Sequence, residues 1–287
     1  AIRAAGGVPF EVRSAAPSDF ITDAGARGGY ILSARDLIPN DVEVAVEGAQ
    51  LDGMLMLTSC DKTVPGQLMA AARLNIPSLV ICCGYQPSGE HHGHHVDIEE
   101  VFIGSMHVLT GNLDREELIG MSREAIKGPG VCSGLGTANS MHIVCEALGM
   151  ALPGSAPIAA MSDRMMAFVR EAGARIVQMV WDDLKPRDIL SAGAFENAVK
   201  AILAVGGSIN SVKHLQAVAT EAQVPVDIYN LFERNADVVP VVSAISPIGT
   251  RKIEEFEAAG ACRGVMKQLE SLMDTSAMTV TGRTVAE

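Results

Sequence analysis

The sequence predicts an α/β protein in which helices flank a mostly parallel sheet, a layered α/β/α arrangement. Residues 53–58 (GMLMLT) form a short apolar run of the kind found in strands buried on both faces. A run of helix formers, QLMAAARL, comes next, and residues 78–83 (SLVICC) form a second apolar run. Strand, helix and strand in this order predict parallel pairing with a right-handed crossover.

Local sequence signals mark the ends of this strand–helix–strand unit and predict the remaining helices and strands. Pro65 lies where a first helical turn begins, and Asn75-Ile76-Pro77 ends that helix. We predict a polar loop at 85–95, and strands or buried segments at 175–181, 238–245 and the C-terminal TVTGRTVAE, the last being a strand or a linker. Helices are predicted at 33–47 with a break near Pro39, 96–127, 137–148, 163–173, 194–204, 212–222, 251–259 and 264–273.

Composition narrows the class of protein. The chain has 287 residues, 48% hydrophobic and 20% charged, which is enough apolar material for a substantial core and excludes disorder. Its net charge of −12 disfavours nucleic acid as a partner. No apolar run reaches the roughly 18 residues of a membrane span. The first residues lack the apolar stretch of a signal peptide, so we expect a cytoplasmic protein with reduced thiols.

Cys60-Asp61-Lys62 is the most unusual triplet in the chain. It directly follows the first predicted strand, at the sheet edge where open α/β proteins bind ligands. It also precedes a helix N-terminus, whose dipole favours thiolate and carboxylate. Adjacent sulfur and oxygen donors suit a soft and a hard metal. From these residues alone, a second interpretation is as well supported as a metal site: a half-buried cysteine beside a surface ion pair.

The other cysteines divide into two groups. Cys132 lies in a second glycine-rich turn that opens onto a helix, which makes it a candidate cluster ligand. Cys145 lies on the apolar stripe of the next helix and is interpreted as a core residue. Cys82 and Cys83 end a predicted strand and are interpreted as packing residues, and Cys262 has no motif around it.

Histidines cluster in 85-YQPSGEHHGHH-95. A helix would bring His91, His94 and His95 near one face and suggest zinc, but the proline and glycines of this segment oppose a helix. We therefore favour a mobile or lid-like loop over a metal site. His142 and His214 lie on predicted helices and are interpreted as structural. Asp23, in a glycine-rich turn, is by its surroundings alone an ordinary turn residue.

Three long motifs, in the order of a known family, cover nearly the whole chain. TSCDKTVPGQLMAAARLNIPSLVICCG resembles the Cys-Asp-Lys motif of the dihydroxy-acid and sugar-acid (6-phosphogluconate) dehydratases. GPGVCSGLGTANSMHIVCEALGMALPGSAP is similar to their second cysteine turn, and RDILSAGAFENAVKAILAVGGSINSVKHLQAVA to their Gly-Gly-Ser-Thr-Asn segment. TVTGRT resembles their inter-domain junction. The resemblance implies that residues 1–287 form the N-terminal domain of a two-domain dehydratase, and we expect the C-terminal domain to be absent from this chain.

The resemblance also implies cofactors. A [2Fe–2S] cluster, [4Fe–4S] in some members, would be held by Cys60, Cys132 and a third cysteine expected upstream of Ala1. Mg²⁺ would be held by Asp23, Asp61 and Lys62, the last carbamylated. Lys62 and Asp61 would thus belong to the catalytic machinery, and the base, a serine, would lie in the C-terminal domain.

The implied reaction is dehydration of a 2,3-dihydroxy carboxylic acid to a 2-keto acid, with a branched-chain dihydroxy acid or a sugar acid as substrate. We expect a small hydroxy-acid substrate, no nucleic acid or membrane partner, and a homo-oligomer, a dimer or tetramer. Ile209 replaces the family's threonine, and Arg27-Gly28-Gly29 and the histidine-rich loop also depart from its pattern. Two alternatives stay open: a non-catalytic binding or assembly module derived from this fold, and a zinc hydrolase that uses the histidines.

Overall fold

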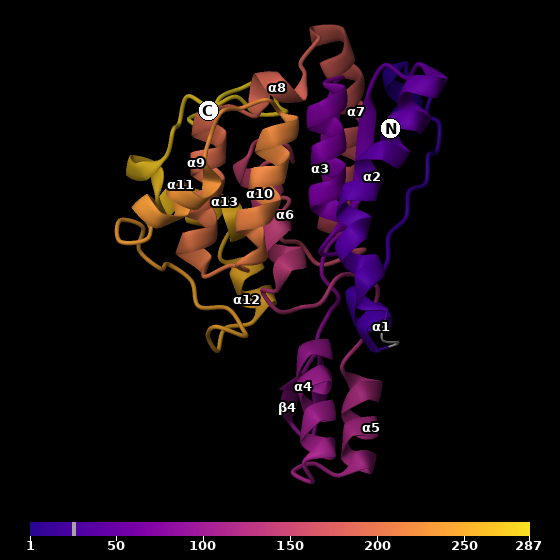
Figure 1. Cartoon of the computed structure of the whole chain (residues 1–287), viewed down its shortest axis with the longest axis vertical. Helices are drawn as coiled ribbons and strands as arrows, with labels where there is room; N and C mark the ends of the chain where they lie inside the picture. Colours follow the sequence, from indigo (N-terminus) through magenta and orange to yellow (C-terminus); the bar gives the residue numbers. More distant parts are fainter. Residues whose placement is uncertain (25–26) are drawn as a thin grey trace.

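The predicted strand–helix–strand unit is present. β1 (Met54–Thr58) and β2 (Ser78–Cys82) pair in parallel, and α3 (Thr63–Leu74) connects them. All five residues of β1 have a partner, from Met54 opposite Ser78 to Thr58 opposite Cys82. The computed structural model describes residues 1–24 and 27–287, except for the side chains of Phe20, Asp23 and Ala24 (Figure 1).

The sheet is smaller than a layered α/β/α fold suggests. Among the described residues it has two strands, extended only by single parallel bridges from Val80 to Ala151 and from Tyr85 to Val131 and Ala159. β2 is buried along its whole length, as its apolar sequence predicts. The α/β class with parallel pairing is therefore confirmed, while helices supply most of the structure.

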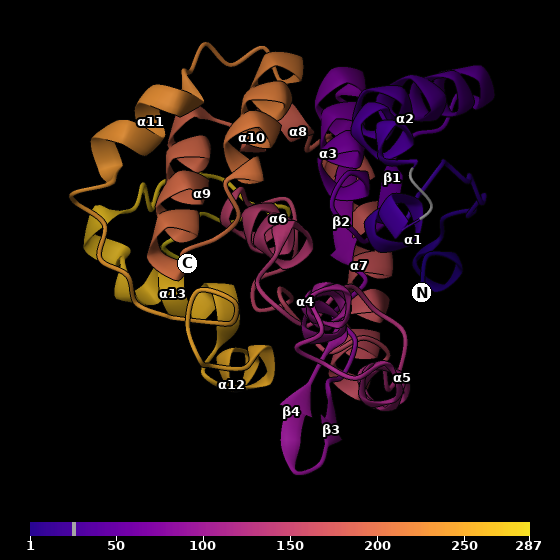
Figure 2. The same cartoon turned by 60° about the horizontal axis from the view of Figure 1, so that its bottom comes forward.

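Long helices surround this small sheet. α2 (Gly28–Ala49) packs on α3, and α7 (Asp163–Asp182) contacts both strands. On the other side α6 (Thr137–Ala147) lies among α3, α9 (Ala192–Val205) and α10 (Asn210–Glu221) (Figures 1 and 2). The shorter elements are η1 (Arg3–Ala5), α1 (Asp19–Ala24), α8 (Pro186–Ile189), α11 (Ile228–Asn235), α12 (Ile253–Ala258), α13 (Ala261–Gln268) and η2 (Glu270–Leu272). None of the helices in the described part of the chain is long and apolar enough to cross a membrane.

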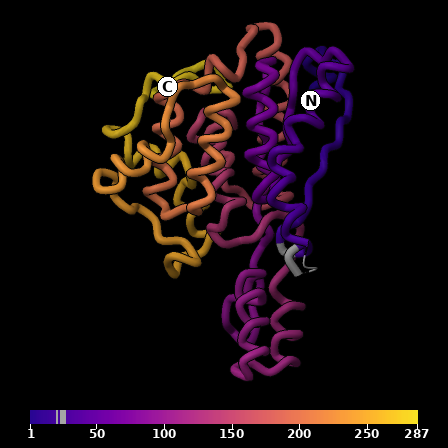
Figure 3. Tube along the Cα trace, in the orientation of Figure 1, coloured from indigo at the N-terminus to yellow at the C-terminus, as the bar shows by residue number. Residues whose placement is uncertain are grey.

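Residues 89–124, which we call the arm, project from one end of the body (Figures 1 and 3). The arm consists of a hairpin, β3 (Gly89–His91) and β4 (His94–Val96), followed by α4 (Ile98–Leu109) and α5 (Arg115–Glu124). Asp97 begins α4 with a full capping box, accepting from the backbone N–H groups of Glu99 and Glu100. The predicted polar loop at 85–95 is thus in part a β-hairpin. The prediction that 96–127 is mainly helical is confirmed by α4 and α5, which a short turn separates.

Three other predictions about secondary structure were wrong. α2 continues through Pro39, because Ile38 and the Arg35 carbonyl pack tightly on Gly66 of α3 and hold the helix there. Residues 175–181 belong to α7, since an apolar run inside a long amphipathic helix resembles a buried strand. Residues 238–245 form no strand, and only Ile245 makes an isolated bridge, to Arg251.

α6 is the most buried helix and carries two titratable side chains inside the core. Burial lowers the pKa of His142 to about 4, and neither ring nitrogen has a hydrogen-bond partner in the described structure. Burial raises the pKa of Glu146 to about 7, although its carboxylate accepts from the Gly154 and Ala156 backbone N–H groups, both at 2.8 Å. Four residues apart on one helix, the two groups respond to pH in opposite directions.

We expect the contributions of these two groups to the free energy of unfolding to cancel each other between about pH 4.5 and 6.5. As pH falls, His142 takes up its proton at a higher pH in the unfolded state than in the folded state. Its contribution to the free energy of unfolding is therefore lost between about pH 6.5 and 4. As pH rises, Glu146 loses its proton at a lower pH in the unfolded state than in the folded state. Its contribution to the free energy of unfolding is therefore lost between about pH 4.5 and 7. Relative to the parent, His142→Leu should therefore lose about 3 kcal/mol more stability as pH rises from about 4 to 6.5, as measured by urea unfolding. A variant with the same pH dependence as the parent would contradict this assignment.

Candidate functional site

Three helix N-termini meet beside the carboxyl ends of β1 and β2. The hydroxyls of Thr137 (α6) and Ser208 lie 2.8 Å apart, and Asn210 of α10 donates to the Thr137 hydroxyl at 3.0 Å. His214 of α10 places Nε2 3.5 Å from Asp61 Oδ1, just before α3. The structure thus joins the Thr-Ala-Asn and Gly-Gly-Ser-Ile-Asn motifs. Converging helix N-termini favour bound negative charge.

Lys62 lies between two carboxylates. Its side chain is 6% exposed, and Nζ lies 2.7 Å from Asp61 Oδ2 and 3.5 Å from Asp19 Oδ2. Burial and a hydrogen bond that protonated Asp19 donates to Asp61 raise the pKa of Asp19 to about 7. Burial opposes ionisation of Asp61 too, but the neighbouring His214, Asp19 and Lys62 side chains outweigh it and lower the pKa of Asp61. One oxygen of each carboxylate, Oδ1, is buried without a hydrogen-bond partner among the described residues.

Cys60 precedes this pair in a strained backbone conformation. Its φ of 40° lies in the left-handed region, which is uncommon for a residue other than glycine. Burial raises the pKa of its thiol, while the backbone amides of Asp61 and Asp19 act in the opposite direction and favour the thiolate. Asp19 therefore contacts both the cysteine and the lysine of the triplet.

Cys132 lies in the turn before α6, against the arm. Burial raises the pKa of its thiol to about 12, with further contributions from Glu99 and Cys60, so the two thiols are close enough to interact. A Cβ on Gly134 would collide with the Glu99 carboxylate, which shows how closely α4 packs on this turn. Burial also raises the pKa of Glu99 to about 7.

Asn139 fixes the Cys132 turn from within α6. Fully buried, it donates from Nδ2 to the Cys132 and Gly134 carbonyls, both at 2.8 Å. We expect Asn139→Ala to lower the free energy of unfolding by about 2 kcal/mol or more, because two carbonyls lose their donor inside the protein. Urea unfolding measures this loss. Asn112→Ala, at an exposed position, is the control and should change stability little.

The structure brings together most of the predicted site residues and adds others. Cys60, Asp61, Lys62 and Cys132 converge, whereas the side chain of Asp23 lies outside the described residues. Asp19 and His214 were missed: Asp19 had no motif around it, and His214 was interpreted as structural. Cys145 and Cys262 are fully buried in the core, as a packing role predicts for Cys145.

The donor set fits two different metals. Cys60 and Cys132 offer soft sulfur on one side, and Asp19, Asp61 and Lys62 gather oxygens and a nitrogen on the other. Buried carboxylate oxygens without partners are costly unless a cation or a proton satisfies them. A buried, partly unsatisfied polar cluster at converging helix N-termini is the arrangement expected of a ligand site.

Comparison with known proteins identifies the family of the chain. The family model described as "Dihydroxy-acid/6-phosphogluconate dehydratase N-terminal" matches residues 1–287. A dihydroxy-acid dehydratase of Methanothermobacter thermautotrophicus is 42% identical over 286 residues, covering 100% of this chain and 52% of the relative. One of Methanosphaera stadtmanae is 40% identical over 287 residues, with the same coverage. The chain thus spans about half the length of the curated relatives it matches, and it belongs to the dihydroxy-acid/6-phosphogluconate dehydratase N-terminal family.

Proposed function

We propose that this chain forms the metal-binding half of a dehydratase that converts a 2,3-dihydroxy carboxylic acid to a 2-keto acid. The observation that carries the proposal is the Cys60-Asp61-Lys62 turn, where a thiol adjoins a lysine held between two carboxylates. The relatives' names support it, because they are dihydroxy-acid dehydratases. In the overall reaction C2 loses a proton, C3 loses hydroxide, water is formed, and the enol tautomerises to the keto acid.

Each metal would use its own donors. Cys60 and Cys132 would supply thiolates to an iron–sulfur cluster, [2Fe–2S] or [4Fe–4S]. Asp61 and carbamylated Lys62 would supply oxygens to Mg²⁺, together with Asp23 as the family resemblance implies. We add Asp19 to this set, because its carboxylate lies beside Lys62 and has a free buried oxygen. When bound, the cluster and Mg²⁺ would supply Lewis-acid chemistry at the leaving hydroxyl and at the carboxylate end of the substrate.

The chain's own residues prepare the site for these groups. The N-termini of α3, α6 and α10 stabilise negative charge there. Asn139 holds the Cys132 turn in place, and His214 lies close enough to orient Asp61. Burial of Lys62 and its neighbours keeps bulk water away from the oxygen donors.

A direct assay tests the proposal. The complete protein, purified without oxygen and supplied with Mg²⁺, should form 2-keto acid from a branched-chain 2,3-dihydroxy acid. A sugar acid assayed in parallel distinguishes the two substrate classes, and activity on either supports the dehydratase proposal. Absence of keto acid from both substrates, in protein shown to contain iron and Mg²⁺, would contradict it and favour a non-catalytic module.

A further inference from the structure

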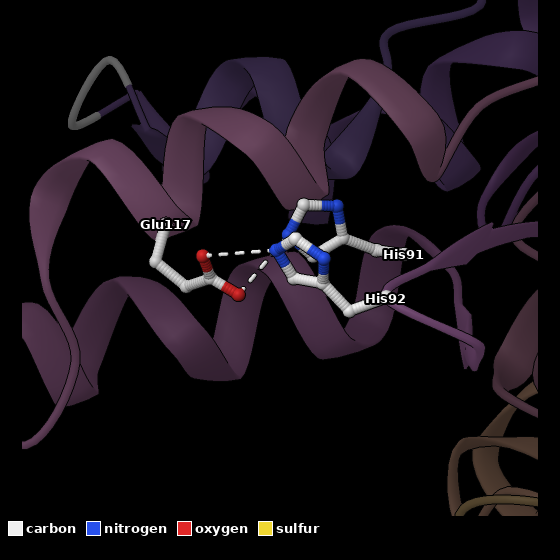
Figure 4. Close-up of side chains that lie close together, drawn as sticks. All are labelled: His91, His92 and Glu117. Atoms are coloured by element: carbon white, nitrogen blue, oxygen red, sulfur yellow. Dashed lines mark hydrogen bonds and ion pairs between the residues drawn. The ribbon is translucent and has the colours of Figure 1, made fainter.

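The arm brings two histidines and a glutamate together, away from the cysteine turns. One ligand atom from each of His91, His92 and Glu117 lies within 4.8 Å of the others (Figure 4). His91 Nε2 is 3.0 Å from Glu117 Oε1, and His92 Nε2 is 3.6 Å from Glu117 Oε2. His91 is half-buried and His92 is exposed, so the cluster opens to solvent on one side.

The hairpin turn places both rings on one side. His91 pairs with His94, which leaves His92 and Gly93 as a two-residue turn with φ values of 50° and 78°. Positive φ at both positions defines a type I′ turn, in which asparagine or glycine is usual at the place of His92. Successive strand residues point to opposite faces, but this turn brings the two ring centroids to 4.1 Å.

α5 supplies the third donor and the space for the ring. Glu117 and Gly120, three residues apart, lie on the same face of the helix. A Cβ on Gly120 would come within 2.7 Å of His91 Cε1, so the glycine makes room for the imidazole. Glycine inside a helix lowers stability by about 1 kcal/mol relative to alanine. At position 120 this loss accompanies the close packing of the His91 ring against the glycine.

We propose that His91, His92 and Glu117 bind Zn²⁺ or a similar transition-metal ion. Two imidazole nitrogens and one carboxylate form a three-ligand zinc set with a fourth position for water. In a tetrahedral zinc site, neighbouring donor atoms lie about 3.3 Å apart, which follows from metal–ligand distances near 2.0–2.1 Å. The observed separations of 3.0 and 3.6 Å bracket that spacing. Imidazole favours such metals over Mg²⁺.

Bound zinc would fasten the hairpin to α5. The ion would replace a histidine–glutamate contact that is exposed in part, and such contacts contribute little by themselves. Because α4 of the same arm carries Glu99 against the Cys132 turn, the ion would also stiffen the segment that covers this turn. The proposal does not depend on the dehydratase activity.

Zinc titration of the complete protein, with a competing chromophoric chelator, tests the site. His92→Asn removes one ligand and keeps a residue suited to the turn, and Glu117→Gln removes the charge with little change in shape. Both should lower the affinity for one equivalent of Zn²⁺ by at least about tenfold, because even loss of a residue that supports a ligand costs that much. Any zinc that the cysteines bind is bound equally by the parent and the variants, so it does not affect the difference in zinc affinity between them.

Two further variants keep the result interpretable. Gly120→Ala should weaken zinc binding by displacing the His91 ring, while the metal-free protein keeps or gains thermal stability. His94→Ala, on the same hairpin but exposed and outside the cluster, should bind zinc as the parent does. The proposal is overturned if His92→Asn and Glu117→Gln bind zinc like the parent. It is equally overturned if His94→Ala loses as much affinity as His92→Asn, since binding would then reflect only a histidine-rich surface.

Discussion

Cys60→Ser and Cys132→Ser are each expected to lower dehydratase activity of the complete protein by at least about 10³-fold and to abolish its visible absorption. The hydroxyl of serine is a hard donor and does not replace a thiolate toward iron. A Lewis acid contributes several kcal/mol to such a reaction, and about 4 kcal/mol corresponds to this loss of rate. Activity is measured by keto-acid formation, and the cluster by absorption and iron content under anaerobic conditions.

Both thiols are held in defined positions, which is why neither loss should be compensated by rearrangement. Cys60 has a left-handed backbone fixed between β1 and α3, and Asn139 holds the Cys132 turn by two hydrogen bonds. Cys83→Ser is the matched control, because Cys83 is also half-buried and burial raises the pKa of its thiol to about 11. That variant should keep its colour and activity. A colourless Cys60→Ser protein with full activity would exclude the cluster from the reaction.

Sequence patterns predicted those parts of the fold that depend on local signals. The β1–α3–β2 unit was recognisable because both strands are continuous apolar runs and the helix has a proline near its start. Its end was marked by Asn75, which indeed adopts a left-handed conformation there. Such signals act within a few residues, so they remain visible in one sequence.

The errors arose where tertiary packing decides between alternatives. RIVQMVW has the composition of a buried strand, yet it forms part of the twenty-residue helix α7. The hairpin in the arm was missed because its turn is His92-Gly93 rather than the more recognisable Asn-Gly. Glu117 comes to the histidines only through the packing of α5 on β3, which sequence spacing does not reveal.

The candidate site shows the same limit. Cys60, Asp61 and Lys62 are consecutive, so their proximity was never in question. Asp19 reaches Lys62 across 43 positions of sequence, and no local pattern distinguishes it from the other aspartates of the chain. His214 lies on the buried face of α10, as a structural residue would, but that face is directed toward Asp61.

The position of Lys62 raises an electrostatic problem for the proposed Mg²⁺ site. As an ammonium group it pairs with Asp19 and Asp61, and it lies where a cation bound to both would be. At about 4 Å and an effective dielectric constant near 20, an ammonium and a divalent ion repel by about 8 kcal/mol. Conversion to a carbamate reverses the sign, because a lysine carbamate is an anionic oxygen ligand. Mg²⁺ binding and a free Lys62 amine are therefore expected to exclude each other.

We accordingly expect Mg²⁺ to stabilise the complete protein only when bicarbonate is present. At a free Mg²⁺ concentration 100 times the dissociation constant, the gain should be about 3 kcal/mol, seen as a higher unfolding temperature. Native mass spectrometry should show one added CO₂ under the same conditions. Lys62→Met should lose the Mg²⁺ effect with or without bicarbonate, whereas Lys213→Met, at an exposed position on α10, should keep it. Equal stabilisation by Mg²⁺ in bicarbonate-free buffer would mean that Lys62 binds no metal as a carbamate, and the oxygen donors would then reduce to the carboxylates alone.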